Sequence, residues 1–130
     1  MEPATGGLKG AIARGDELKR QWTQDGTLLT PKAFARRRQV SVDELRSAEA
    51  RGELFSMLVD NKPYYLAELL KFAPADAAAL CAALGPEDPS TKLNFFLRRH
   101  GMLDGKTVAQ AVKCGDMDEA LNAAAGWRGR

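Results

Sequence analysis

Residues 30–52 read TPKAFARRRQVSVDELRSAEARG, and this stretch decides the fold because it contains the start signals of two short helices. Thr30 before Pro31 predicts the first helix, with a hydroxyl cap followed by proline at the first helical position. Residues 41–44 predict the second helix, since they form a capping box in its acidic variant, and Gly52 is its stop signal. Two short helices joined by a tight turn predict a helix-turn-helix.

The period of the sequence changes after Gly52. Residues 54–59 are an apolar run rich in strand formers, residues 60–63 carry turn chemistry, and residues 64–66 predict a second short strand. A β-hairpin that follows the second helix directly turns the motif into a winged helix-turn-helix, which we assign to residues 27–66.

Helical patterns flank this motif on both sides. Residues 1–26 form an N-terminal helical segment with a helix expected over residues 16–24, and residues 67–130 form a helical module. The fold class is therefore expected to be mostly α: a winged helix-turn-helix with one β-hairpin, followed by a small helical bundle. In the module, helices are expected over residues 74–84, 92–100 (capped by Ser90 or Thr91), 108–114 (capped by Thr107) and 117–125, with Gly126 as the final stop.

The composition of the 130 residues is that of a small soluble globular chain, with 45% hydrophobic and 28% charged side chains. The longest apolar run falls far short of the roughly 20 residues that a membrane span needs, so no membrane partner is expected. Two cysteines and one histidine nearly exclude a four-ligand zinc site and fit a reducing cytoplasm, and no cofactor is expected. The net charge of +2 arises in residues 27–66, where seven basic side chains outnumber five acidic ones, so the charge permits DNA binding without arguing for it.

The stretch KLNFFLRRHGMLDGKTVAQAV, residues 92–112, resembles the toxin-binding domain of Xre/MbcA/ParS-type antitoxins, and the resemblance covers residues 68–127. Residues 103–108 occupy the place of that family's Leu-Gly-Gly-x-Thr-Pro-like turn. Asp104 stands where the first paired glycine is usual, and Val108 where the proline is usual. The resemblance implies a helical module that binds a protein toxin, often a RES-domain enzyme that consumes NAD. It also implies a partner module that dimerises and represses its own operon.

The N-terminal motif is more similar to the compact winged helix-turn-helix of MerR-like and excisionase-like proteins than to the Xre helix-turn-helix. The likeness rests on residues 29–35, LTPKAFA, which open the motif, and residues 52–55, GELF, which begin the wing. It implies that the second helix and the wing contact an operator. A homodimer is expected, because one small helix-turn-helix on one half-site gains little affinity.

The second helix carries both the best candidates for base contacts and the charges that oppose them. Arg46 and Ser47 lie on its outward face, from which they would reach base edges. The carboxylates of Asp43, Glu44 and Glu49 share the helix and would repel phosphate. The three arginines that end the first helix would contact phosphates, or alternatively stabilise that helix terminus at a solvated face, and the lysine of the wing would contact DNA or remain a solvated turn residue. The candidate DNA-binding residues are Arg36, Arg37, Arg38, Ser41, Arg46, Ser47 and Lys62.

The helical module offers candidate partner contacts instead of a catalytic centre. Trp127 is either a packing lid or an anchor for a partner, and of the adjacent phenylalanines Phe95 and Phe96 one can face the core while the other faces a neighbouring surface. His100 is interpreted as a helix-end histidine that the helix dipole favours, because no nucleophile or carboxylate lies at a spacing that would make it a catalytic base. The candidate partner-binding residues are Phe95, Lys106, Thr107, Trp127 and Arg128.

Two function hypotheses remain open from the sequence. The first is a non-catalytic, antitoxin-like DNA-binding regulator that blocks a partner toxin and represses transcription. The alternative is a protein–protein adaptor whose winged fold no longer binds DNA, which the weakly charged second helix favours. An enzyme is not expected, since a phosphate-binding loop, a metal constellation and a recognisable carboxylate pair are all missing from the sequence.

Overall fold

The protein is described here by a computed structural model, which describes residues 15–127. Residues 15–25 are helical, in agreement with the helix predicted over residues 16–24. The elements that follow are β1 (Leu28–Leu29), α2 (Pro31–Arg38), α3 (Val42–Ala50), β2 (Ser56–Val59), β3 (Lys62–Leu66), the 3-10 helix η1 (Ala67–Lys71), α4 (Pro74–Leu84), α5 (Pro89–Leu97), the 3-10 helix η2 (Gly101–Leu103), α6 (Val108–Lys113) and α7 (Met117–Trp127).

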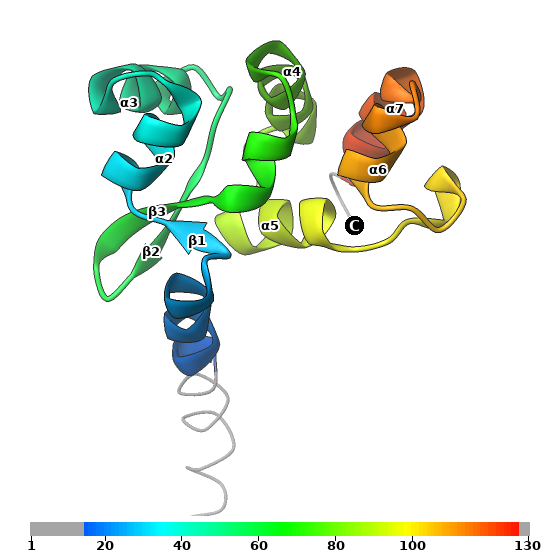
Figure 1. The fold of residues 1–130 in the computed structure, drawn as a ribbon. Coiled ribbons are helices and arrows are strands. Elements are labelled where there is room, and N and C mark those ends of the chain that lie inside the picture. The colour runs from blue at the N-terminus through cyan, green and yellow to red at the C-terminus, as the bar shows by residue number, and fades with distance from the viewer. Residues whose placement is uncertain (1–14, 128–130) are drawn as a thin grey trace, which may run out of the picture.

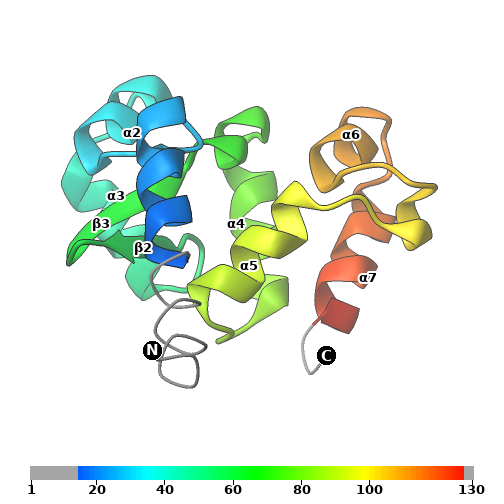
Figure 2. The ribbon, with the colours of Figure 1, turned by 90° about the horizontal axis from the view of Figure 1, so that it is seen from below.

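The fold is mostly α with a small sheet, as predicted, and its elements lie in three groups (Figure 1). Figures 1 and 2 both place α2, α3 and the β2–β3 hairpin on one side, and α6 and α7 on the opposite side, with α4 and α5 between them. The hairpin turn points away from the α6–α7 side in both views. The winged helix-turn-helix and the helical bundle are thus both present in the chain order that the sequence predicts.

The sheet has three antiparallel strands in the order β1-β3-β2, although the sequence predicted only the hairpin. The added strand, β1, is two residues long, and it pairs Leu28 with Leu66 and Leu29 with Tyr65. So short a strand carries no period of its own, and it forms because β3 offers it an edge. Leu28 is 2% exposed, so this strand places a large side chain in the core.

The hairpin turn is tighter than predicted, because only Asp60 and Asn61 lie between the paired residues Val59 and Lys62. Both turn residues have positive φ, 51° and 66°, which is the backbone of a two-residue type I′ turn. Pro63 therefore lies inside β3 instead of in the turn. A proline nitrogen has no hydrogen to donate, but the strand loses no bond at this position. Pro63 belongs to a pair whose main-chain groups face away from β2, and on the other side β1 reaches only to Tyr65.

Two helices of the C-terminal half differ from the prediction at their ends. α5 begins at Pro89 and not at Lys92, because the carboxylate of Asp88 accepts the Thr91 N–H at 2.7 Å and so acts as the cap. α5 also ends at Leu97, three residues earlier than expected. α7 continues through Gly126 to Trp127, so this glycine is not a stop. A glycine costs a helix about 1 kcal/mol, which the packing of α7 against its neighbours offsets.

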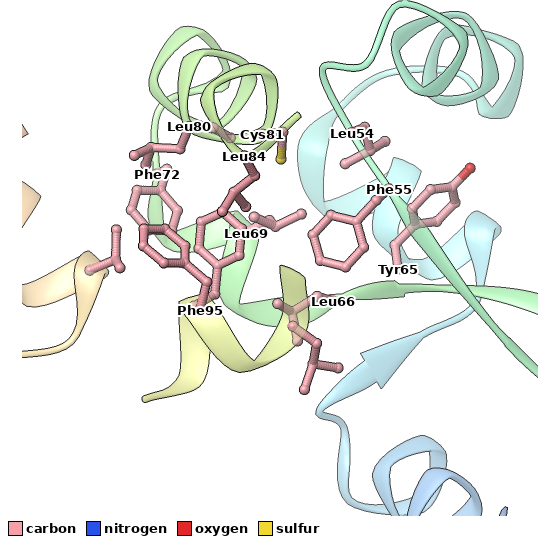
Figure 3. Close-up of a cluster of buried hydrophobic side chains, with 14 of the residues drawn as sticks. Leu54, Phe55, Tyr65, Leu66, Leu69, Phe72, Leu80, Cys81, Leu84 and Phe95 are labelled. Carbon is pink, nitrogen blue, oxygen red and sulfur yellow. The ribbon is translucent and has the colours of Figure 1, made fainter. Parts of the chain in front are cut away.

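One hydrophobic core runs through both predicted modules (Figure 3). Its buried members extend from Leu28 in the sheet to Ala124 in α7. The rings of Phe55, just before β2, and Phe96 in α5 stack at 6.1 Å across the predicted boundary at residues 66–67, and Phe72 meets Phe96 edge-on at 5.7 Å. The winged motif and the helical bundle are therefore packed together as one body.

Candidate nucleic-acid interface

Local caps set the geometry of the helix-turn-helix. The Thr30 side chain accepts the Ala33 N–H at 3.2 Å and begins α2. Gln39 then adopts a left-handed conformation with φ 61°, which ends the helix where a glycine is usual. Ser41 begins α3 with the predicted capping box, since its hydroxyl accepts the Glu44 N–H at 3.1 Å and the Glu44 carboxylate accepts the Ser41 N–H at 3.2 Å. These caps hold α3 in a fixed relation to α2.

Six of the seven predicted DNA contacts are exposed, and five of these lie on the three elements that a winged helix-turn-helix would apply to DNA. Arg36 and Arg37 lie in the last turn of α2, Arg46 and Ser47 on α3, and Lys62 at the start of β3 beside the hairpin turn. All five side chains are open to solvent. The geometry therefore permits contact with phosphates and bases at these positions.

Arg38 differs from these five because its side chain is engaged within the protein, so its role as a DNA contact stays a prediction. Its guanidinium donates to the main-chain carbonyl of Phe72 at 2.7 Å and to that of Leu69 at 3.2 Å. The side chain is half-buried, and burial lowers the pKa of its guanidinium below the ordinary value. Arg38 thus satisfies two carbonyls at the end of η1 and ties α2 to the helical bundle, which leaves it turned inward.

Ser41 also serves the fold, although its residue is exposed. Its hydroxyl lies 3.1 Å from the Glu44 N–H and 3.2 Å from the Glu44 carboxylate, so both its acceptor and its donor are engaged in the cap of α3. A DNA phosphate at this position would have to compete with those bonds. The sequence predicted both roles for Ser41, and the geometry supports the cap.

The three carboxylates of α3 are in different environments. Glu49 is half-buried, and it accepts the Ser56 hydroxyl at 2.7 Å and the Tyr65 hydroxyl at 2.9 Å. Glu44 is held in the cap. Asp43 is exposed, and within residues 15–127 no hydrogen bond or ion pair holds its side chain. Two of the three negative charges of the helix are thus committed to bonds within the protein.

The contact between Glu49 and Tyr65 anchors α3 on the sheet. Tyr65 is 2% exposed, and its ring lies 5.4 Å from that of Phe34 in α2. Burial, and after it the hydrogen bond to the Glu49 carboxylate, raises the pKa of Tyr65 to about 12. The sequence offered no sign of this contact, because the two residues are 16 positions apart and neither belongs to a recognisable motif.

The hairpin turn has an ion pair that sequence reasoning also missed. Two nitrogens of Arg20, in the helix of residues 15–25, each lie 3.3 Å from a different carboxylate oxygen of Asp60 in the turn. Both side chains are largely exposed, so the pair contributes at most a fraction of a kcal/mol, about 0–1. Its geometric effect is to hold the turn, and Lys62 next to it, beside the first helix.

The predicted partner contacts other than Trp127 fall into three groups. Phe95 is fully buried at 0% exposure, so the prediction that it touches a partner is wrong: its ring packs on Phe96, His100 and Trp127. Lys106 and Thr107 are half-exposed, and the Thr107 hydroxyl caps α6 by accepting the Gln110 N–H at 3.3 Å. Arg128 lies outside the described residues.

Trp127 behaves as a packing lid in this structure. Its indole N–H donates to the Thr91 carbonyl at 3.1 Å, and its ring lies 5.3 Å from that of His100. The guanidinium carbon of Arg98 lies over the indole, 5.9 Å from the ring centroid. The ring is half-buried, so it closes the end of α5 and still presents an edge to solvent.

The prediction of His100 as a helix-end histidine is wrong, because α5 ends before it. His100 is 8% exposed, and its main chain forms a bridge with Lys106. Its Nε2 lies 2.8 Å from the Phe95 carbonyl, which fixes this nitrogen as the donor. The only histidine of the sequence is therefore held between aromatic rings inside the bundle.

Two surface grooves adjoin these elements. One, of about 530 Å³, lies between α3 and α4 and is lined by apolar side chains such as Val40, Leu45 and Ala77, with charged residues of α3 also lining it. Another, of about 810 Å³, lies between the start of α4 and α6 and includes Leu97 and Val112. Within the described part of the chain, no group of three or more His, Cys, Asp or Glu side chains is arranged to hold a metal ion.

The comparisons with known proteins leave the family of this chain open. No family model, no curated protein and no solved structure matches it. None of the helices described between residues 15 and 127 has the length and apolar character needed to cross a membrane.

Proposed function

We propose that this protein is a non-catalytic, antitoxin-like DNA-binding regulator, in which the winged helix-turn-helix binds an operator and the helical bundle binds and blocks a protein toxin. The observation that supports DNA binding is the environment of the polar and charged side chains of α3. Arg46 and Ser47 are exposed on it, while Glu44 and Glu49 are bonded within the protein. The carboxylate of Glu49 is therefore turned away from the outward face of the helix, whereas that of Glu44 is held in the cap and remains exposed.

The elements next to α3 add positive charge to the proposed DNA-binding surface. Arg36 and Arg37 at the end of α2 and Lys62 beside the wing turn are exposed cations on either side of α3 in the chain. In proteins that bind DNA, cations of this kind supply the sequence-independent, salt-sensitive part of the affinity. Base contacts would then come from Arg46 and Ser47.

The toxin-binding half rests on the resemblance of residues 92–112 and on the fold of that stretch. Thr107 and Gln110 form the reciprocal cap that begins α6 after the turn at residues 103–106. Asp104 adopts φ 56° and Gly105 φ 77°, so the turn has the left-handed backbone that a pair of glycines would take. A RES-type toxin is the partner that the resemblance favours. The cytoplasm is the compartment we propose, since Cys81 and Cys114 are both free thiols.

The proposal that the protein is non-catalytic rests on the environment of His100. This side chain is the one histidine available as a general base, and its ring nitrogen is bonded to a main-chain carbonyl beneath Trp127. The residue is also only 8% exposed, so the ring has no open route to a substrate. We therefore assign His100 to packing.

A salt titration of binding to duplex DNA tests the DNA-binding half. For the wild-type chain we expect the logarithm of the binding constant to fall linearly with the logarithm of the salt concentration. The double variant Arg36→Gln, Arg37→Gln should lower that slope by about 1.8, since each neutralised phosphate contact accounts for about 0.9. The variant Lys113→Gln is the matched control, because it removes an exposed cation from α6 on the far side of the molecule (Figure 1).

Two outcomes would contradict the proposal. One is a wild-type chain that does not bind duplex DNA at low salt. The other is a single-charge control variant that loses about half as much of the slope as the double variant, which would show that binding follows net charge and not this surface. The toxin-binding half is tested by co-expression with the product of the neighbouring reading frame, where we expect a stable complex and relief of any growth arrest which that product causes.

The second candidate function is a protein–protein adaptor with a winged fold. Exposed Asp43 favours it, because this carboxylate lies on α3 and would meet DNA phosphates if the helix entered a groove. The same titration separates the two functions, since an adaptor shows no salt-dependent binding to DNA. The variant Asp43→Asn sharpens the test: it should strengthen binding if α3 faces DNA and leave it unchanged if α3 does not.

A further inference from the structure

Strand β2 is an edge of the sheet. In the strand order β1-β3-β2 its one neighbour is β3, and within residues 15–127 no main-chain hydrogen bond from a loop or another element reaches residues 56–59. Figure 1 shows the hairpin extending from the body on the side opposite α6 and α7. An edge of this kind offers a row of main-chain donors and acceptors to another strand.

The register of the hairpin determines which groups point outward. Val59 and Lys62 flank a two-residue turn and form a hydrogen-bonded pair, as do Met57 and Tyr64 two residues further on. The main-chain groups of Ser56 and Leu58 therefore point away from β3. They present two N–H donors and two carbonyl acceptors along the free edge.

The side chains on this edge lack the features that usually prevent strands from pairing. The strand reads Ser-Met-Leu-Val, so it carries neither charge nor proline, and the proline of the hairpin lies on the inner strand β3. Leu58 is 59% exposed, more than any other large hydrophobic side chain in the described part of the chain. It lies opposite exposed Pro63, so an apolar surface accompanies the open edge.

We propose that the β2 edge is a dimerisation surface, occupied by β2 of a second copy of this chain in antiparallel pairing. The pairing that uses all the outward groups sets Ser56 opposite Leu58 of the second copy, and Leu58 opposite its Ser56, around a two-fold axis at Met57. The two Leu58 side chains then become diagonal neighbours on one face and cover each other. The pairing would bury the exposed Leu58 side chain, and it fits the absence of charged residues from β2.

The charges near the edge fit the same pairing. Continuing the register beyond the strand sets Leu54 opposite Asp60 of the second copy, so the charge nearest the pairing meets an apolar side chain and stays paired with Arg20 of its own chain. The paired strands themselves carry no charge, so no like charges meet along them. The contact is small, which places the dimer among weak, concentration-dependent associations. It would form without DNA, so it goes beyond the proposed function and does not depend on it.

Sedimentation velocity of the full chain over a concentration series tests the dimer. We expect the wild-type chain to pass from monomer to dimer and Leu58→Lys to remain monomeric, because it places two like charges side by side at the axis. Leu18→Lys is the matched control: Leu18 is also exposed, at 44%, but lies in the first helix, so this variant should dimerise as the wild type does. Circular dichroism of all three should agree, since neither leucine is in the core.

A cross-linking experiment locates the interface independently. In a Cys114→Ser background, where the remaining Cys81 is buried, Leu58→Cys should give a covalent dimer with a short bismaleimide, and Leu18→Cys should not. The proposal is overturned by a wild-type chain that stays monomeric throughout the series, by a Leu58→Lys variant that dimerises normally, or by equal cross-linking at both positions.

Discussion

The two hydrogen bonds that Glu49 accepts hold α3 on the sheet, and the variant Glu49→Ala tests how much they stabilise the fold. The variant removes a carboxylate that accepts two hydroxyl groups, from Ser56 at 2.7 Å and from Tyr65 at 2.9 Å. A hydrogen bond to a charged group contributes about 1.5–3 kcal/mol, and the half-buried setting of Glu49 reduces this. Ser56 can turn to water, whereas the largely buried Tyr65 cannot do so readily. We therefore expect a loss of about 2–3 kcal/mol in the free energy of unfolding.

A double-mutant cycle with Tyr65→Phe isolates the contact. The single variant Tyr65→Phe should cost about 1–1.5 kcal/mol, and the coupling energy between the two sites should be about 1 kcal/mol. Urea unfolding followed by tryptophan fluorescence and by circular dichroism measures both quantities. A loss below about 0.5 kcal/mol for Glu49→Ala, the size expected of an ordinary surface site, would refute the reasoning. It would mean that this carboxylate faces solvent and still opposes DNA.

The same network predicts a loss of stability at high pH. The pKa of Tyr65 is raised to about 12 from 10.0, mainly by burial and then by the bond to Glu49. The fold therefore favours the neutral phenol, so this stabilisation is complete below about pH 10 and is lost as the pH rises towards 12. Allowing for solvent screening, we expect about 1–2 kcal/mol to disappear in that window. Tyr65→Phe should abolish the loss, while Tyr64→Phe, the control, should retain it.

Three further predictions concern single residues. Arg38→Gln should lower the free energy of unfolding by about 2 kcal/mol, because two main-chain carbonyls at the end of η1 lose their donor. The same variant should leave the salt slope of DNA binding unchanged, and a lower slope would show that Arg38 contacts phosphate. Asp88→Ala should cost about 1 kcal/mol in thermal or urea unfolding, while Ser90→Ala should cost almost nothing, and the reverse order would contradict the cap of α5. Gln39→Gly should stabilise the chain by about 0.5–1 kcal/mol, since its backbone has φ 61°, and a destabilised variant would contradict that conformation.

Two charged side chains of the motif do not lie on the proposed DNA-binding surface. Arg38 and Glu49 lie on the two helices of the motif, and both turn inward to satisfy groups of other elements. Their removal from the surface takes away one positive and one negative charge, so the net charge of the motif is unchanged while its pattern is altered. The exposed remainder of the two helices is Lys32, Arg36, Arg37 and Arg46 against Asp43 and Glu44, and the carboxylate of Glu44 is held in the cap of α3.

The sequence by itself determined the features whose causes lie within a few residues. Thr30 with Pro31, Ser41 with Glu44, and Thr107 with Gln110 are caps that satisfy main-chain groups at most three residues away, and the helices begin where these caps predict. The winged helix-turn-helix and its hairpin follow from those signals together with the change of period after Gly52. Such information is local, so it can be read from the chain without knowing the fold.

The tertiary structure decided everything that depends on a distant partner. β1 exists because β3 offers an edge, Arg38 turns inward because carbonyls 31 and 34 residues away need donors, and Glu49 is tied down by a hydroxyl 16 residues away. The sequence pattern predicts His100 at a helix end, whereas in the structure its ring packs between those of Phe95 and Trp127. The physical reason is the same in each case: a side chain bonds to whichever group the fold brings near, and that group leaves no mark in the neighbouring sequence.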